Sequence, residues 1–240
     1  MRARVSSILI AILVLAVGFN RSFANNIKAR FEDDKKITYK VTYNGIPSGY
    51  IIWKYSGKQE VNGKEAIVVV LEADTQILKL LNLTTNEKVF LDSETYLPLK
   101  VQRDLVFFGK KEVIEEIYYQ DKGEIVIKKI NSKTTKQVLK QDKPIHNILD
   151  LLYFFPKNIQ FQKGKWIDFN LPTQKLKIKM IGERTLRING GKEDAYLLLG
   201  RGARRFNLWL DKKTRLPLRV DFITLAGKIT IIQQEDKHDS

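Results

Sequence analysis

Side chains that could carry out catalysis are few in this chain of 240 residues. The chain has no cysteine, which excludes a thiolate nucleophile, and its two histidines are His146 and His238. His238 lies in a polar tail, and His146 follows Pro144 closely, where packing or capping fits better than acid–base catalysis. Neither a Gly-x-Ser-x-Gly nor a His-Glu-x-x-His motif occurs. The sequence therefore predicts neither nucleophilic catalysis nor a zinc site of histidine and cysteine.

The acidic residues lack the pairing that glycoside hydrolysis needs, which is two carboxyl groups that face each other. Glu115 and Glu116 are adjacent, so on a strand they would point to opposite faces. No segment has the alternating Asp and Asn of a calcium loop. Residues 200–205, Gly-Arg-Gly-Ala-Arg-Arg, could bind an anion, but a loop with solvated arginines is the simpler explanation. We expect no enzymatic activity, no metal and no cofactor, and a glycan hydrolase is the least favoured alternative.

The first 24 residues have the layout of a secretory signal peptide. Arg2 and Arg4 provide a positive start, residues 7–19 are apolar, and Ser22 and Ala24 are small residues spaced as at a cleavage site. The apolar run is shorter than the roughly 20 residues that span a bilayer. We expect cleavage after Ala24, a mature chain 25–240 that forms a single β domain, and export to the periplasm. An uncleaved anchor in the inner membrane is the alternative.

The mature chain is strongly basic. The formal net charge is +15, and residues 1–24 carry three arginines and no acidic residue, so 15 − 3 = +12 remains. This charge favours anionic partners such as a membrane surface, and export argues against nucleic acid. A lysine-rich surface with solvated charge pairs is the simpler explanation. Without cysteines the exported domain has no disulfides, so an apolar core must stabilise it.

One string occurs twice in the chain. Leu-Asp-x-x-Thr-x-Leu-Pro-Leu, then a basic residue and Val, stands at 91–101 and again at 210–220. The Asp suits the first position of a β-turn, and the residues that follow alternate as in a half-buried strand. An Asn-Gly pair, a strong hairpin signal, precedes each copy. The pattern predicts an internal two-fold hairpin repeat with halves at about 37–130 and 165–233. Two unrelated hairpins with common turn residues are the alternative.

Short alternating segments bounded by turn residues fill most of the remaining chain. The exception is about 145–155, which is apolar without alternation and lies between two prolines, so we expect a helix. The predicted fold class is mainly β, a single curved antiparallel sheet or open half-barrel of about a dozen strands with one covering helix.

Four strings together resemble the bacterial exported proteins of the domain-of-unknown-function 3108 family, from about Tyr39 to Gln233. In chain order they are Tyr43-x-Gly45-Ile46-Pro47-x-Gly49, Leu80-Leu81 with the first Leu-Asp-x-x-Thr-x-Leu-Pro-Leu-Lys, Asp150-Leu151-Leu152-Tyr153, and Leu208-Trp209-Leu210-Asp211 with Leu-Pro-Leu-Arg. The last hairpin is also similar, at the level of fold, to the periplasmic lipoprotein-carrier superfamily. That likeness implies an open half-barrel whose helices cover an apolar concave face.

These features favour a non-enzymatic envelope protein that binds a lipid, a lipoprotein acyl chain or another apolar ligand in a concave half-barrel. The alternative is a structural protein that binds an envelope partner through a sheet edge or a basic face. The expected apolar contacts, for which ordinary core packing is the competing explanation, are Trp53, Phe90, Leu149, Leu152, Phe155 and Trp209. The expected anion-binding rim is Arg103, Arg204, Arg205 and Arg219.

Overall fold

The computed structural model describes residues 36–77, 81–151, 160–224 and 227–234. Its strands belong to one antiparallel sheet in the order β8-β7-β6-β5-β4-β3-β2-β1-β14-β13-β12-β11-β10-β9. The bounds are β1 Lys36–Tyr43, β2 Ile46–Val61, β3 Lys64–Ile77, β4 Leu81–Asp92, β5 Pro98–Phe107, β6 Lys110–Tyr119, β7 Glu124–Ile130, β8 Thr134–Lys140, β9 Trp166–Leu171, β10 Gln174–Ile188, β11 Gly191–Arg201, β12 Arg205–Asp211, β13 Pro217–Thr224 and β14 Gly227–Gln233.

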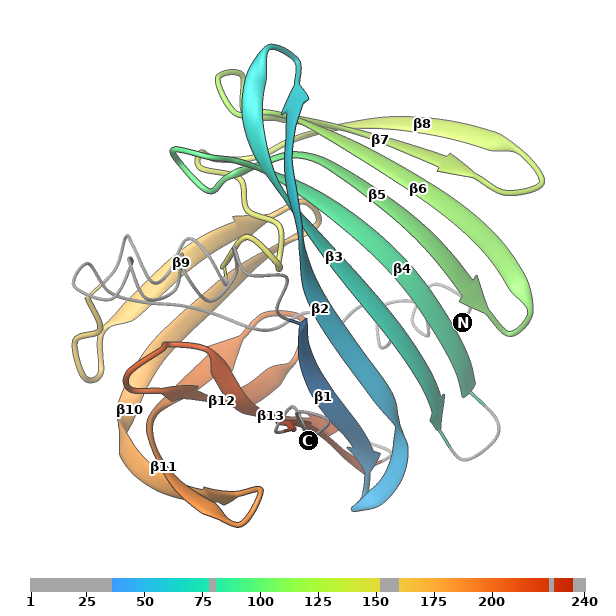
Figure 1. Cartoon of the computed structure of the whole chain (residues 1–240). Coiled ribbons are helices and arrows are strands. Elements are labelled where there is room, and N and C mark those ends of the chain that lie inside the picture. Colours follow the sequence, from blue (N-terminus) through green and yellow to red (C-terminus); the bar gives the residue numbers. More distant parts are fainter. Residues whose placement is uncertain (1–35, 78–80, 152–159, 225–226, 235–240) are drawn as a thin grey trace.

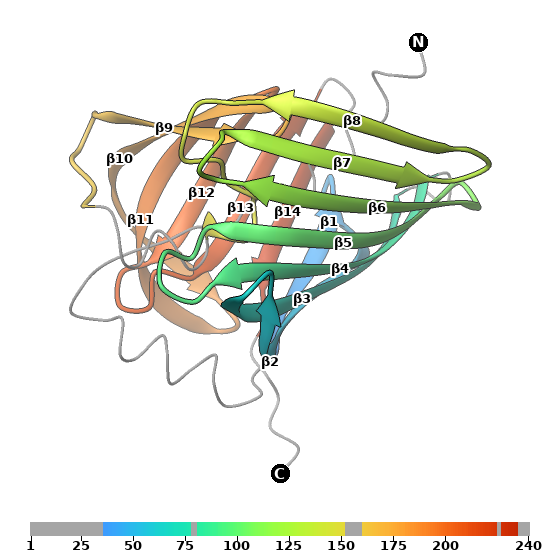
Figure 2. The same ribbon diagram turned by 90° about the horizontal axis from the view of Figure 1, so that it is seen from above.

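The sheet curls strongly, and its two halves meet where β1 pairs with β14 (Figure 1). The edge strands β8 and β9 do not pair with each other in the described chain, so the sheet is open rather than a closed barrel. Residues 141–151, here called the strap, join these edges (Figure 2). Ile145 bridges to Asn170 of β9, and its backbone N–H and C=O both bond the side chain of Gln120 at the end of β6. The strap therefore links the two halves opposite the β1–β14 seam.

One large apolar cluster lies on the concave face of the sheet. Its residues alternate along the strands with residues of the opposite face, and they come from both halves and from the strap, which meet only on the concave side. Val89 and Leu91 of β4, Leu208 of β12 and Leu149 of the strap belong to this concave cluster. Two small clusters lie on the opposite, convex face. The first contains Ala66, Val68, Phe90 and Leu99, and the second contains Ile188, Ala195 and Leu218, with Trp209 packed against it.

The two copies of the repeated string form turns with the same hydrogen bonds. Asp92 Oδ1 accepts the backbone N–H of Glu94 and Thr95, while Asp211 Oδ1 accepts those of Lys213 and Thr214. The residue after each Thr has a positive φ, 60° for Tyr96 and 58° for Arg215. Each turn therefore joins two neighbouring strands, β4 to β5 and β12 to β13.

The structure departs from the sequence-based expectation in two elements. The sheet has 14 strands rather than about a dozen, and β8 was missed because all its residues except Leu139 are exposed, which removes the alternation. The predicted helix at 145–155 does not begin as expected, since Ile145 forms a bridge and 148–150 form a turn. Residues 152–159 of that segment lie outside the described chain.

Local hydrogen bonds mark where helical geometry begins in the strap. Asp150 Oδ2 accepts the backbone N–H of Asn147 at 2.8 Å, and Asn147 Oδ1 accepts that of Leu149 at 2.8 Å. This reciprocal pattern caps the start of a helix, with Asn147 as the N-cap residue, and Leu151 has helical geometry. Helical geometry therefore begins after Asn147 rather than at Ile145.

Candidate ligand site on the concave face

Three charged side chains from adjacent strands meet on the concave face. Arg103 of β5 contacts Glu87 of β4 (Nε to Oε2, 2.5 Å) and Glu116 of β6 (Nη1 to Oε1, 3.6 Å). Tyr118 donates its hydroxyl to Glu116 Oε2 at 2.6 Å. Glu87 and Glu116 are only 2% and 6% exposed, so the group replaces apolar side chains in the middle of the sheet. We call these four residues the buried ion cluster.

Electrostatics keep Arg103 charged in this cluster. Burial lowers the pKa of Arg103, but the charges of Glu87 and Glu116 outweigh burial, and the pKa of Arg103 ends above its usual value. Burial raises the pKa of Tyr118, and the neighbouring Glu116 raises it further, so the phenol remains a donor. Because two carboxylates surround one guanidinium, Arg103 is not available to bind a further anion.

Four other buried polar atoms on the concave side of β1–β4 have no hydrogen-bond partner among the described residues. They are Tyr39 Oη, Trp53 Nε1, Thr75 Oγ1 and Glu87 Oε1. The rings of Tyr39 and Trp53 lie against each other with centroids 4.5 Å apart, and burial raises the pKa of Tyr39 well above its ordinary value. An unsatisfied buried polar atom costs about 1–3 kcal/mol. This part of the concave face can therefore both donate to and accept from a polar partner.

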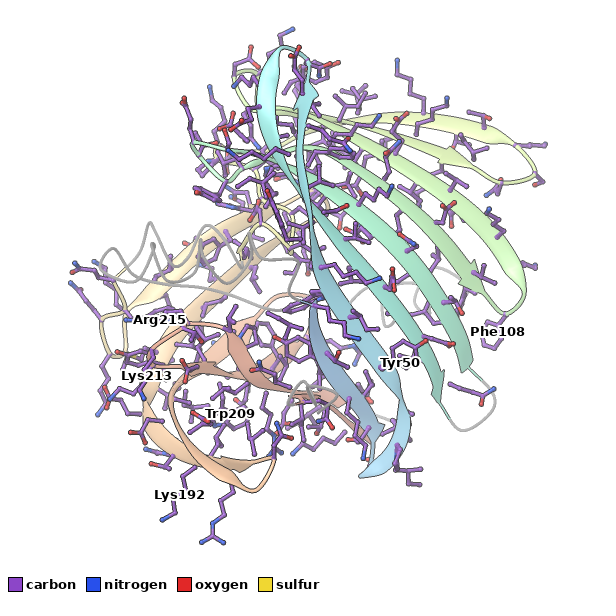
Figure 3. The ribbon with its side chains drawn as sticks, in the orientation of Figure 1. Tyr50, Phe108, Lys192, Trp209, Lys213 and Arg215 are labelled. Atoms are coloured by element: carbon purple, nitrogen blue, oxygen red, sulfur yellow. The ribbon has the colours of Figure 1, made fainter. Side chains whose placement is uncertain are left out.

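Arg215 is a second cation at the margin of the concave cluster, in the turn between β12 and β13 (Figure 3). It is 6% exposed, and its Nε and Nη1 have no partner among the described residues. Its guanidinium lies 4.3 Å from the ring centre of Tyr196 and 5.8 Å from that of Phe161, and both rings pack against the concave cluster. Its Nη2 donates to Tyr196 Oη at 3.4 Å. Burial lowers the pKa of Arg215, and the nearby Tyr196 and Asp211 offset only part of that lowering.

The strap carries a buried His–Asp pair. His146 Nδ1 and Asp150 Oδ1 are 3.1 Å apart, and the two side chains are 2% and 0% exposed. The His146 ring meets Phe169 of β9 edge-on at 5.4 Å, and a hydrogen bond joins Asn147 to Tyr118. Burial raises the pKa of Asp150, and His146 opposes part of that rise. The pair is internal to the strap and buried from solvent, and the contact of His146 with Phe169 holds it against β9.

The apolar residues that the sequence suggested do not form one site. Trp53 and Leu149 both belong to the concave cluster. Phe90 and Trp209 do not, because each alternates with concave residues along its strand and therefore points to the convex face. Leu152 and Phe155 lie outside the described residues.

The four arginines expected at an anion-binding rim are also separated. Arg103 is inside the buried ion cluster. Arg219 lies over the Trp209 ring on the convex face and donates twice to Asp221, at 2.9 Å each. Burial acts to raise the pKa of Asp221, but hydrogen bonds from Arg219 and from Lys228 outweigh it and lower that pKa. Arg219 is therefore already neutralised.

Arg204 and Arg205 stand at the β11–β12 turn and have no ion pair within the described part of the chain. The loop does not form an anion cradle, because the backbone N–H of Gly202 donates to Arg204 O and that of Ala203 donates to Gln174 Oε1. These two arginines thus remain surface cations without a built site.

Sequence reasoning missed Arg215 and Glu87, and it considered Glu116 only as half of a catalytic pair. Two signals could have found Arg215 and Glu87. Arg215 occupies the place that Tyr96 takes in the first copy of the repeated string, so the copies differ there. Glu87 lies two residues before Val89, in the apolar phase of β4, and such a charge needs a buried partner.

A surface groove of about 800 Å³ beside β10 and β11 is a weaker candidate. Lys192 and Lys213 line it, but so do Asp194 and Asp211. The mixed charges already serve local contacts, such as the 2.8 Å hydrogen bond from Thr185 to Asp194. The groove therefore lacks the uncompensated charge that distinguishes Arg215.

The fold and the concave polar groups define an open β half-barrel with a buried, partly charged concave face. The profile of a family described as "Protein of unknown function (DUF3108)" matches residues 38–233, and the chain belongs to this family. A comparison with curated proteins found no match.

Two solved structures are similar to this chain. A β-barrel-like protein of the domain of unknown function DUF1849 from Brucella abortus has 10% identity and a TM-score of 0.55, covering 83% of this chain and 95% of that one. This match shows a related β-barrel-like fold. A protein from Bacteroides fragilis, described as exported and with a YmcC-like fold, has 7% identity and a TM-score of 0.27, covering 92% of this chain and 100% of that one. At that score we base no argument on it.

The described residues contain neither a candidate metal cluster nor a candidate membrane-spanning helix. Among them, no cluster of three or more His, Cys, Asp or Glu side chains could hold a metal ion. In that same part of the chain, no helix has the length and apolar character to cross a membrane.

Proposed function

We propose that this chain is a non-enzymatic protein of the cell envelope, exported to the periplasm. In this proposal it binds an amphipathic ligand, an acyl chain that carries an acidic group, against the concave face of its sheet. The curvature of the sheet and the large concave cluster support the proposal that the acyl chain lies against this face. The proposal that the ligand carries an acidic group is supported by one side chain, Arg215.

Arg215 is the observation on which this proposal rests. A buried guanidinium with two unpartnered nitrogens is costly, so it persists in such a place when an anion completes it. Nε and Nη1 offer donors to a carboxylate or a phosphate, and Tyr196 and Phe161 flank the guanidinium. The unpartnered atoms of Tyr39 and Trp53 can bond further polar groups of the ligand.

We further propose that the two halves repeat one structural unit. Phe90, Ala66 and Leu99 of the first convex cluster occupy the same places in the repeated string and its upstream hairpin as Trp209, Ala195 and Leu218 in the second. The matching turns at Asp92 and Asp211 support the same interpretation. In this view Arg215 is a change in one copy that makes only the second half able to hold an anion.

The first test is native mass spectrometry of the mature protein purified from a bacterial envelope, before and after organic extraction. We expect a bound acidic lipid near one per chain that extraction removes. A protein that carries no small molecule, and that also fails to bind the fluorescent fatty acid cis-parinaric acid, would contradict the proposal.

Substitution separates the role of Arg215 from general apolar binding. Arg215→Tyr places the residue of the first copy at the same positive φ, so the turn is preserved. We expect it to weaken cis-parinaric acid binding by about tenfold or more, the scale of one charge-assisted hydrogen bond. The double variant Arg204→Gln, Arg205→Gln is the control and should bind as the wild type does. Equal affinity in all three proteins would refute the role of Arg215.

The alternative, a partner bound at a sheet edge, has weaker support. β8 is an edge strand with Val138 53% exposed, but Lys136 and Lys140 also stand on it. Lysines on edge strands oppose pairing with another chain. Cross-linking in the periplasm that traps one stable partner through β8 would favour this alternative.

A further inference from the structure

Phe108 occupies a position that is unfavourable for its own fold. It is 52% exposed and has a φ of 49° in the two-residue turn between β5 and β6, where Gly109 follows with a φ of 73°. Such turns favour Asn at the first position, because a bulky side chain is strained at positive φ. Three other turns of this kind in the same chain follow that rule, with Asn44, Asn62 and Asn189. The Phe108 ring touches that of Phe107, with centroids 4.4 Å apart, but this one contact leaves half of the ring exposed and does not account for a phenylalanine at positive φ.

The surroundings of Phe108 are basic and partly apolar. The β5–β6 tip (106–113) and the β7–β8 tip (128–136), together called the tip segments, contain six lysines and one glutamate. All six lysines are exposed, and Lys110 and Lys133 have no ion pair in the described part of the chain. Val106 and Ile130 add exposed apolar surface, at 37% and 38%.

The two tip segments project from the same end of the sheet. β6 pairs with β7 from Val113 opposite Ile130 to Tyr119 opposite Glu124, so both hairpin tips lie beyond the same end of this pairing. Figure 2 shows the tips side by side, with the opposite end of β6 far from them. An aromatic residue at the centre of an exposed lysine-rich edge matches the chemistry of a membrane interface, where aromatic rings enter the headgroup layer and lysines contact lipid phosphates.

We propose that the tip segments dock onto an anionic lipid bilayer, with Phe108 inserted between headgroups. Charge complementarity selects this occupant, since six lysines against one glutamate favour an anionic surface. The inference rests on the proposed envelope location but not on a ligand at the concave face. Docking would hold the open sheet beside the membrane.

The test is co-sedimentation of the mature protein with vesicles of phosphatidylglycerol and phosphatidylcholine, compared with phosphatidylcholine alone. We expect binding only to the anionic vesicles, weakening as salt is raised. Phe108→Asn should reduce the partition coefficient by about fivefold, while its melting temperature stays equal to the wild type or rises. Lys110→Gln with Lys133→Gln should reduce it by roughly twentyfold, since each lysine near an anionic surface contributes about a fivefold factor.

Matched controls lie at distant sites. Tyr119, 37% exposed at the opposite end of β6, is replaced by Asn, and Lys192 and Lys213 beside the β10–β11 hairpin are replaced by Gln together. Both controls should bind vesicles nearly as the wild type does.

Three results would overturn the proposal. These are no binding of the wild type to anionic vesicles, equal losses in the tip and control variants, or a dimer in solution that Phe108→Asn dissociates. If the tip variants lose vesicle binding but still bind cis-parinaric acid, then membrane docking and ligand binding at the concave face are separate properties, and each proposal can fail without the other.

Discussion

Replacement of Arg103 by Met tests how much this guanidinium stabilises the two buried carboxylates beside it. Met keeps an unbranched apolar side chain of similar length but removes the charge that faces Glu87 and Glu116. The two carboxylates would then stand on a face where they are 2% and 6% exposed. Removing one partner of a buried ion pair costs about 3–5 kcal/mol of unfolding free energy. For a chain of this size that corresponds to a fall in melting temperature of roughly 6–20 °C.

The assay is urea unfolding near neutral pH, together with calorimetry. Arg219→Met is the matched control, because it also removes a guanidinium from a carboxylate, Asp221, that is 4% exposed. Asp221 keeps the ammonium group of Lys228 at 2.8 Å, so we expect a loss below about 2 kcal/mol.

A compensated variant separates the missing charge from the changed shape. Combining Arg103→Met with Glu87→Gln and Glu116→Gln removes all three charges at once. Replacing a whole buried charge group is often neutral, so this variant should recover most of the lost stability. Equal stability of the Arg103→Met and Arg219→Met proteins, within about 0.5 kcal/mol, would refute the reasoning, because water would then reach the concave carboxylates.

Two further predictions concern packing and pH. Gly200→Ala should lower the unfolding free energy by about 1–3 kcal/mol or more in thermal melts, because the added Cβ would lie 1.6 Å from the Phe206 ring. Gly182→Ala is the control, since no atom lies nearer than 3.8 Å to its added Cβ, and it should be nearly neutral. The folded-state pKa of Asp221 is lowered, so ionised Asp221 adds to the unfolding free energy above about pH 4. This stabilisation is lost as the pH falls through the folded-state pKa. Asp221→Asn should abolish that loss in melts recorded across the same pH range. The folded-state pKa of Asp150 is raised, so its effect on stability has the opposite sign: the unfolding free energy falls as the pH rises from about 4 through the folded-state pKa. Asp150→Asn should flatten that slope. An unchanged slope would mean that His146 fully compensates the carboxylate.

Much of the local structure could be predicted from the sequence. The Asn-Gly pairs and the alternation around Leu97–Val101 predicted hairpins, because turn chemistry and strand period act over a few residues. β8 was missed because every residue of this edge strand except Leu139 is exposed, so it has no alternation of apolar and polar residues. The predicted helix start at 145 was too early, because Asn147 and Asp150 form a cap after which helical geometry begins, and residues 152–159 of that segment lie outside the described chain.

The candidate site was far less predictable. Phe90 and Trp209 look like binding residues in the sequence, yet the bulges beside them and the strand period assign them to the convex face. Conversely, Glu87 and Glu116 look like solvent-exposed charges until the sheet brings Arg103 between them. A residue's face depends on the register of its neighbours, and register depends on strands that are distant in the chain.

The class of this protein could be inferred from its residues alone: mainly β, free of disulfides and of a cysteine nucleophile, and similar to one family of unknown function. These properties follow from residue types and short-range spacing, which need no fold to be evaluated. Three features depend on the tertiary structure: β1 pairs with β14, carboxylates neutralise Arg103, and two nitrogens of Arg215 have no partner among the described residues. Each of these depends on contacts across the curled sheet, where burial and partner geometry, rather than residue type, set the free energy of a charge.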